Sequence, residues 1–158
     1  MGRYQIIEAK TWHCGAIIRR LREEHQEAVA WLGINSHREI RDKFDVSTYR
    51  RAWTIDGRLA GLGGVVGTAL SSEGFVWLAL TNEAARHPYA SVRMVHRQLA
   101  EVMTVKRVLH TCLIPEDKAA LRFATKLGFE IVDPTPRPVG RGRVIAAQYR
   151  LIPIERAA

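Results

Sequence analysis

The chain has 158 residues, of which 47% are apolar and 25% are charged, a composition typical of a globular protein with one hydrophobic core. Its longest mainly apolar stretch, residues 59–70, is shorter than the roughly 20 residues that a membrane span requires. The N-terminus lacks the apolar core of a signal peptide, and Cys14 and Cys112 form no CxxC pair. We therefore expect a single cytoplasmic domain over residues 1–158, with neither a metal site nor a disulfide framework.

The charge balance favours anionic partners. Lys and Arg number 24 against 16 Asp and Glu, which gives a formal net charge of +8, and most of the cations are arginines. Such a surface attracts nucleic acid or a phosphate-bearing cofactor. The arginines are spread along the chain, so a solvated basic surface without a specific partner is the competing interpretation.

The first part of the chain predicts one strand and two helices. Residues 4–8 are short and apolar, as in a strand. Helical spacing over residues 17–32 predicts an amphipathic helix, with Gly33 as its C-terminal cap. Ser36 and Glu39 form a capping-box pattern before a shorter helix over residues 40–44.

The middle of the chain predicts an antiparallel meander. Residues 51–55 have strand character, and Asp56-Gly57 is the pair that a two-residue hairpin turn favours. The glycines of the return strand, residues 59–69, indicate a bulge or a close backbone approach. After a turn, residues 75–80 form an apolar run typical of a strand buried on both faces, in which Trp77 is expected to be a core residue.

A crossover helix is predicted to begin at His87-Pro88 and to lead into a strand over residues 107–114. A helix over residues 120–127 should then end at Gly128, which we expect to adopt positive φ. Residues 129–132 and 144–152 read as strands. The intervening prolines, at 134, 136 and 138, predict a rigid loop.

The resulting order, β-α-α-β-β-β-α-β-α-β-β, predicts an α/β fold with a mixed central sheet and helices on both faces. The strands at residues 75–80 and 108–114 should be parallel neighbours, because a helix connects them. Strand ends beside a helix N-terminus form a natural site for a phosphate-bearing ligand.

The segment Ala120-Leu-Arg-Phe-Ala-Thr-Lys-Leu-Gly-Phe129 resembles the closing helix of the GCN5-related N-acetyltransferases (GNAT), N-x-x-A-x-x-F-Y-x-K-x-G-F, with Asp117 in place of the Asn. The resemblance implies the GNAT fold and acetyl-CoA as co-substrate. Several features, including Arg22-Glu-Glu-His25, Trp77-Leu-Ala-Leu-Thr81 and Arg93, are similar to acetyltransferase-like proteins of tailed bacteriophages. The cofactor-binding positions that the resemblance implies are Leu80, Thr81, Arg86, Ala90, Ser91, Val92, Arg93, Asp117 and Ala124.

The chain departs from the family where the family binds pyrophosphate, on a glycine-containing Q/R-x-x-G-x-G/A turn. No glycine lies between Gly74 and Gly128, so either Tyr89 and Ser91 or Ala90 and Val92 occupy the glycine sites. Ala124 stands where many relatives have the tyrosine that protonates the leaving thiolate. Both departures weaken the case for binding and catalysis.

The resemblance implies an N-acetyltransferase whose amine or protein acceptor is unknown, with Glu24 and His25 as candidate catalytic residues near the substrate groove. The alternative is a non-enzymatic phage or prophage assembly protein that keeps the fold, in the virion or the host cytoplasm. Nucleic-acid binding, for which only the charge argues, and a homo-oligomeric state stay open.

Three other groups of residues carry competing interpretations. His110 and Cys112 alternate on one strand face and suggest a nucleophile pair, but a core cysteine and a structural histidine are the simpler interpretation. His13-Cys14 lacks a second ligand pair for a metal. The cations Arg137, Arg141 and Arg143 flank the proline loop, where they either meet an anionic partner or are solvated.

Overall fold

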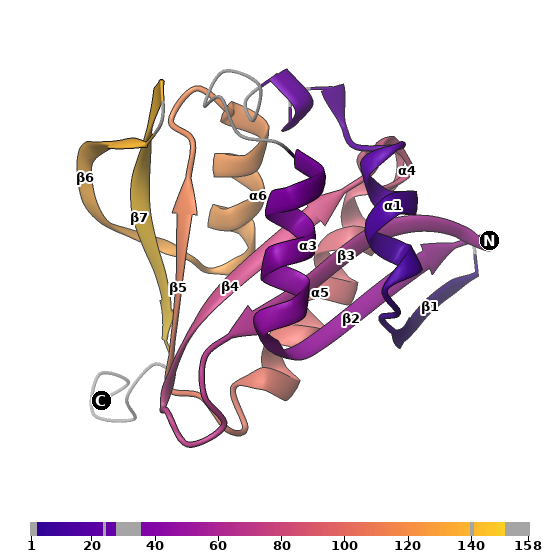
Figure 1. The fold of residues 1–158 in the computed structure, drawn as a ribbon, viewed down its shortest axis with the longest axis horizontal. Helices are drawn as coiled ribbons and strands as arrows, with labels where there is room; N and C mark the ends of the chain where they lie inside the picture. Colours follow the sequence, from indigo (N-terminus) through magenta and orange to yellow (C-terminus); the bar gives the residue numbers. More distant parts are fainter. Residues whose placement is uncertain (1–2, 24, 28–35, 140, 151–158) are drawn as a thin grey trace.

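The computed structural model describes residues 3–23, 25–27, 36–139 and 141–150. Its core is a seven-stranded sheet in the order β1-β2-β3-β4-β5-β7-β6 (Figure 1). The strands are β1 (Tyr4–Glu8), β2 (Ser47–Ile55), β3 (Arg58–Val66), β4 (Glu73–Leu80), β5 (Val108–Leu113), β6 (Glu130–Val139) and β7 (Gly142–Arg150). The helices are α1 (Trp12–Ile18), α3 (Ser36–Val46), α4 (Asn82–Arg86), α5 (Pro88–Val102) and α6 (Lys118–Leu127). The expected mixed α/β fold is confirmed.

The predicted meander is present as β2, β3 and β4, which pair antiparallel. Asp56 and Gly57 turn the β2–β3 hairpin with φ values of 51° and 77°, the left-handed pair that a type I′ turn requires. The predicted close backbone approach occurs at Gly61, where an added Cβ would lie 2.1 Å from Trp53 Cζ2. The Trp53 ring therefore packs directly on the β3 backbone.

The sheet opens between β4 and β5. These strands are parallel, as predicted, but only Glu73–Phe75 pair with Val108–His110. Beyond Phe75 the two strands diverge, and β5 instead pairs along its whole length with β7. The gap between the two strands widens toward their C-terminal ends, as Figure 1 shows.

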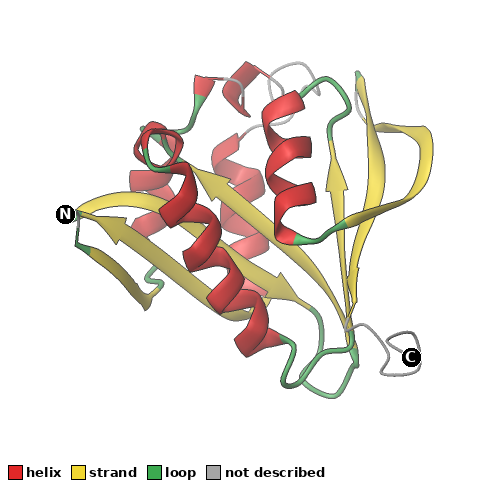
Figure 2. Cartoon of the chain, turned by 180° about the vertical axis from the view of Figure 1, so that it is seen from behind, coloured by secondary structure: helices red, strands yellow, loops and turns green. Residues whose placement is uncertain are grey.

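Helices cover both faces of the sheet. Helices α1 and α3 lie on one face, and α5 and α6 lie on the other (Figures 1 and 2). Two buried clusters correspond to these faces, one with Ile17, Phe44 and Trp77, the other with Leu99, Leu109 and Leu127. Trp77 is thus a core residue, as expected. No helix of the described residues is long and apolar enough to cross a membrane.

The single helix expected over residues 17–32 is wrong at residues 19–22, whereas residues 17–18, 23 and 25–27 are helical and residues 28–32 lie outside the described residues. Helix α1 begins earlier, at Trp12, and ends at Ile18, because Leu21 forms an isolated bridge with Thr81 at the end of β4. A strand-type contact with another element interrupts the helical path although the apolar spacing continues. The Gly33 cap lies outside the described residues, and the Ser36 side chain does too, although α3 does begin at Ser36.

The predicted proline loop is also wrong, because Pro134, Pro136 and Pro138 lie within β6. β6 pairs only with β7 and forms an edge of the sheet, where a missing N–H interrupts no second ladder. Helix α4, a single short element between β4 and α5, is absent from the predicted order. It was missed because its residues follow β4 without a loop and have no apolar period.

Candidate functional site

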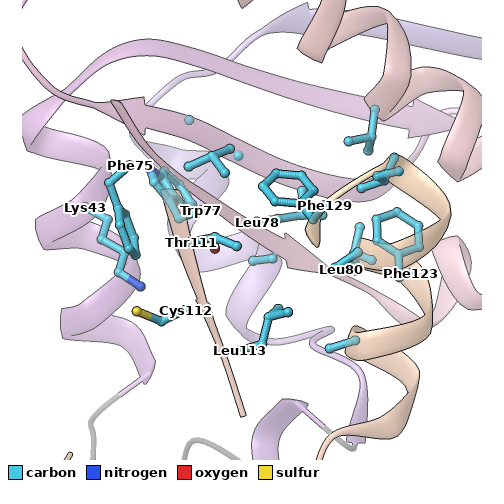
Figure 3. Close-up of a pocket in the computed structure, with 18 of the residues that line it drawn as sticks. Lys43, Phe75, Trp77, Leu78, Leu80, Thr111, Cys112, Leu113, Phe123 and Phe129 are labelled. Carbon is cyan, nitrogen blue, oxygen red and sulfur yellow. The ribbon is translucent and has the colours of Figure 1, made fainter. Parts of the chain in front are cut away.

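A cavity of about 370 Å³ lies where β4 and β5 diverge. Figure 3 shows that its side chains come from both faces of the sheet, with Phe123 and Phe129 at one end and Lys43 and Phe75 at the other. Leu78 and Leu80 of β4 line it between them. The cavity is mainly apolar and reaches through the sheet.

Backbone groups of β4 add polar character to this apolar wall. The Thr81 N–H donates to the Ala60 carbonyl on the β3 side, whereas the Leu80 carbonyl, facing the other way, accepts from the Arg22 N–H (3.1 Å). Because strand residues alternate, Val76 and Leu78 share the orientation of Leu80. The ladder with β5 ends at the pair Phe75–His110, whose last hydrogen bond uses the Val76 N–H, so the Val76 carbonyl and the Leu78 peptide groups face the gap beyond the paired part of β5.

Arg22 and Asp117 meet at the open end of the cavity. Asp117 caps α6, since its Oδ1 accepts from the Ala120 N–H (3.0 Å). Its Oδ2 lies 3.8 Å from Nη2 of Arg22, and both side chains are largely buried. Through its backbone bond to Leu80 and its ion pair with Asp117, Arg22 links the end of β4 to the start of α6.

His25 lines the same cavity and is half-buried. Burial lowers the pKa of its imidazole, and the positive charge of Arg22 lowers the pKa further. A neutral imidazole at pH 7 is a competent proton acceptor. The other candidate catalytic residue, Glu24, lies outside the described residues.

Tyr49 contributes a hydroxyl group to the cavity wall and was not among the site residues predicted from the sequence. Its O–H contacts the Gln98 side-chain oxygen and Glu101 Oε2. Burial raises the pKa of this phenol, and the hydrogen bond to Glu101 raises it further. Tyr49 therefore holds its proton tightly and is a poor substitute for the acid that is missing at Ala124, which also lines the cavity.

The N-terminus of α5 offers few free amides. Pro88 has no N–H, and the Ser91 N–H already donates to the His87 carbonyl (3.0 Å). The Ser91 side chain is 1% exposed and donates to the Ala84 carbonyl (3.1 Å), so it faces α4. Only the amides of Tyr89 and Ala90 are left to bind an anion, and Tyr89 is 85% exposed.

The cavity brings together only part of the predicted site. Leu80, Asp117, Ala124 and His25 line it, and α5 reaches it further along, at Val95. The predicted residues outside its wall are Thr81, Arg86, Ala90, Ser91, Val92 and Arg93.

Besides Ser91, two of these outlying residues have partners of their own within the protein. The Thr81 hydroxyl is buried and donates to the Leu59 carbonyl (2.9 Å). The exposed Arg86 pairs with Glu83 (3.3 Å), which leaves its charge partly neutralised.

The simpler interpretation of His110 is confirmed, because its ring nitrogens contact Gln148 on β7 and Glu73 on β4. Cys112 was expected to be a core cysteine, and this is wrong, because the structure exposes it. Among the described residues no three His, Cys, Asp or Glu side chains could hold a metal ion together.

Of the arginines that flank the proline segment, two form surface ion pairs. Arg137 pairs with Asp133 (3.2 Å), and Arg143 pairs with Glu116 (2.9 Å). Arg141 is exposed. An anion that binds at this edge would have to compete with both carboxylates.

Arg22 is the charged residue whose place sequence reasoning did not anticipate. It stands in a run of Arg and Glu that reads as the solvated face of a helix. Its burial depends on the bridge between Leu21 and Thr81, residues 60 positions apart, for which the local sequence carries no signal.

No model of a known protein family matches the sequence, and a search of curated proteins gives no significant match. Among solved structures, the chain is similar to the ribosomal-protein-S18-alanine N-acetyltransferase of Escherichia coli, with a TM-score of 0.65, 16% identity and 94% of each chain covered. It is similar to YncA of Salmonella typhimurium, solved with its cofactor acetyl-CoA, with a TM-score of 0.63, 16% identity and 94% of each chain covered.

A third similar structure is the PaiA N-acetyltransferase of Thermoplasma acidophilum in complex with coenzyme A. Here the TM-score is 0.66 and the identity 13%, over 94% of this chain and 99% of that one. With the splayed β4–β5 pair and the element order already described, these likenesses show that the chain has the fold of the GNAT N-acetyltransferases.

Proposed function

We propose that the chain is an N-acetyltransferase that transfers an acetyl group from acetyl-CoA to an amine. The observation that carries the proposal is the cavity between β4 and β5, where the Val76 carbonyl and the Leu78 peptide groups lie beyond the end of the β4–β5 ladder, among apolar side chains. A pantetheine arm has the matching character, because its amides need hydrogen-bond partners and its methylene groups need apolar contact. The similar structures solved with coenzyme A or acetyl-CoA support the same assignment.

The pyrophosphate end of acetyl-CoA fits less well than the pantetheine end. Its natural position is the N-terminus of α5, where a partial positive charge and free amides attract phosphate. Only Tyr89 and Ala90 have free amides there, although exposed Arg93 adds positive charge one turn along. We therefore expect acetyl-CoA to bind mainly through its pantetheine arm.

In the proposed reaction acetyl-CoA supplies a thioester carbonyl that is open to attack by a neutral amine. His25 accepts the proton that the amine loses while the nitrogen–carbon bond forms and the carbon–sulfur bond breaks. Because burial keeps the pKa of His25 low, the imidazole is ready to accept this proton at pH 7. The sulfur departs as a thiolate, which is stable enough near neutral pH to need no side-chain acid in place of Ala124.

Calorimetric titration of acetyl-CoA and of coenzyme A into the purified protein tests the proposal first. We expect binding at micromolar or tighter concentrations, followed by acetylation of amines when the products are read by mass spectrometry. His25→Gln should retain binding and lose about a hundredfold of the rate. A folded protein that binds neither ligand would overturn the proposal and favour the non-enzymatic assembly protein, which stays a prediction, as does the phage resemblance.

A further inference from the structure

The charged side chains around the cavity indicate which kind of acceptor amine it can bind. Two carboxylates belong to its described wall, Glu39 and Asp117, and each faces a cation. Glu39 Oε1 lies 2.6 Å from Lys43 Nζ, and Asp117 Oδ2 lies 3.8 Å from Arg22 Nη2. The described wall therefore has no unpaired carboxylate with which to bind the ammonium group of an amine.

Arg22, by contrast, has hydrogen-bonding capacity to spare. A guanidinium carries five N–H donors, and 3.8 Å to Asp117 is longer than a hydrogen bond. Its Nε has no acceptor among the described residues, although the residue is only 9% exposed. A buried charged donor without an acceptor is costly, so a group that enters the cavity and accepts from Arg22 gains affinity.

The position of Arg22 is fixed before any ligand arrives. Its backbone N–H is bound to the Leu80 carbonyl, and Asp117, which draws the guanidinium toward α6, is itself held by the Ala120 N–H. A guanidinium held in place binds a planar carboxylate through two parallel hydrogen bonds. The cavity, at about 370 Å³, has to hold the reacting end of the thioester as well, so the acceptor must be small.

We infer that the acceptor is a small amine that also carries a carboxylate, an amino-acid-like molecule, and that Arg22 binds this carboxylate. The inference rests on the proposed function for the reaction itself. It explains why a cation with an unused donor, Arg22, stands in the wall of a site that should receive an amine. A polyamine acceptor would instead place a second ammonium near Arg22 and Lys43, without a free carboxylate to offset the repulsion.

The test compares amino acids with the amines that lack only their carboxylate, such as alanine with ethylamine and phenylalanine with phenethylamine. Acetylated products are quantified by mass spectrometry with acetyl-CoA as donor. We expect kcat/KM to favour the amino acids at least tenfold. Arg22→Gln should raise KM for the amino acids about tenfold to a hundredfold, with a smaller change in kcat, and remove the preference.

Two further variants complete the design. Arg22→Lys keeps the charge and loses the paired donors, so it should retain part of the preference. Arg20→Gln, an exposed arginine two residues away, should leave the preference unchanged. Thermal melts establish whether each variant is folded. If Arg22→Gln does not fold, Arg22→Lys decides whether Arg22 binds the carboxylate of the acceptor.

The outcomes separate the inference from the proposed function. Equal acetylation of both members of each pair would overturn the inference and leave the acetyltransferase proposal intact. If acetyl-CoA does not bind, the proposed function fails, and titration of the same amino acids into wild type and Arg22→Gln still decides whether Arg22 binds a carboxylate. Equal binding, or none to either protein, would overturn the inference on its own.

Discussion

The guanidinium of Arg22 lies 3.8 Å from the carboxylate of Asp117, across the open end of the gap between β4 and β5. The residues are 95 positions apart in sequence and belong to the segments that follow α1 and β5. Their contact connects the two sides of the gap where β4 and β5 have no ladder of their own. It also brings a cation and a helix cap into the cavity wall.

Replacing Asp117 by Asn tests this contact. Asn caps a helix as well as Asp does, so the α6 cap should survive, but Arg22 would lose its counter-charge. We expect the free energy of unfolding to fall by about 1–3 kcal/mol, measured by urea denaturation. The double variant with Arg22→Met should recover part of this loss. A double variant no more stable than Asp117→Asn would contradict the importance of the pair.

Two glycine substitutions at the N-terminus of α5 should differ in their effect on stability, although the sequence pattern gives both positions the same role. Tyr89 is exposed, so Tyr89→Gly should leave the thermal midpoint nearly unchanged and, if acetyl-CoA binds there, tighten its dissociation constant. Ser91→Gly should destabilise the protein by about 1–2 kcal/mol, because it removes the hydrogen bond to the buried Ala84 carbonyl. Calorimetry and thermal melts on both variants measure this contrast, and equal stability losses would refute it.

Gly128 is the left-handed cap of α6, with φ of 102°. Gly128→Val should lower the free energy of unfolding by at least about 1 kcal/mol, because a Cβ strains this conformation and would lie 3.2 Å from the Tyr149 ring. Gly15→Ala is the matched control, since Gly15 is helical and its Cβ would meet only Arg19 at 3.6 Å. That variant should gain about 0.5–1 kcal/mol. Equal melting temperatures for the two variants would contradict the assignment.

His13 should make stability depend on pH. The Lys10 N–H donates to its Nδ1, so the proton of the neutral ring is on the buried Nε2. Burial lowers the pKa of His13 below 6.5 in the folded state. Above about pH 6.5 the ring is neutral in both states and contributes no pH dependence. Below it the unfolded chain takes up the proton first, so stability falls until the folded pKa is passed.

Urea unfolding at intervals between pH 8 and pH 5 measures this slope. His13→Asn places an oxygen near Nδ1 to accept from Lys10 and should reduce the slope. The remainder should belong to His25, whose pKa burial also lowers. A slope unchanged by His13→Asn and by His25→Gln would show that neither histidine is responsible.

The sequence was sufficient to predict features set by local conformation. Asp56-Gly57 and Gly128 occupy left-handed backbone positions because such residues tolerate positive φ, and both turns are where the pattern placed them. The parallel pairing of β4 with β5 followed from the helix between them. These features depend on neighbouring residues and on chain connectivity, which can be read directly from a sequence.

Other parts of the fold depended on distant partners. The predicted helix over residues 17–32 is interrupted at residues 19–22, where Leu21 pairs with Thr81, and the proline segment is a strand because β6 lies at an edge of the sheet. The apolar period and the prolines are the same in either arrangement. Only the assembled sheet decides which backbone groups are left to pair.

The residues of the site also fall into those that the sequence predicted and those that only the tertiary structure shows. From sequence came Asp117 and Ala124, recognised through the pattern of one helix, and His25, which stood out on an apolar stripe; all three line the cavity. The tertiary structure decided that Ser91 faces α4 and that Arg22 is buried with unused donors. Burial and hydrogen-bond satisfaction are sums over neighbours from the whole chain, so they are defined only once β4, β5 and α6 have come together.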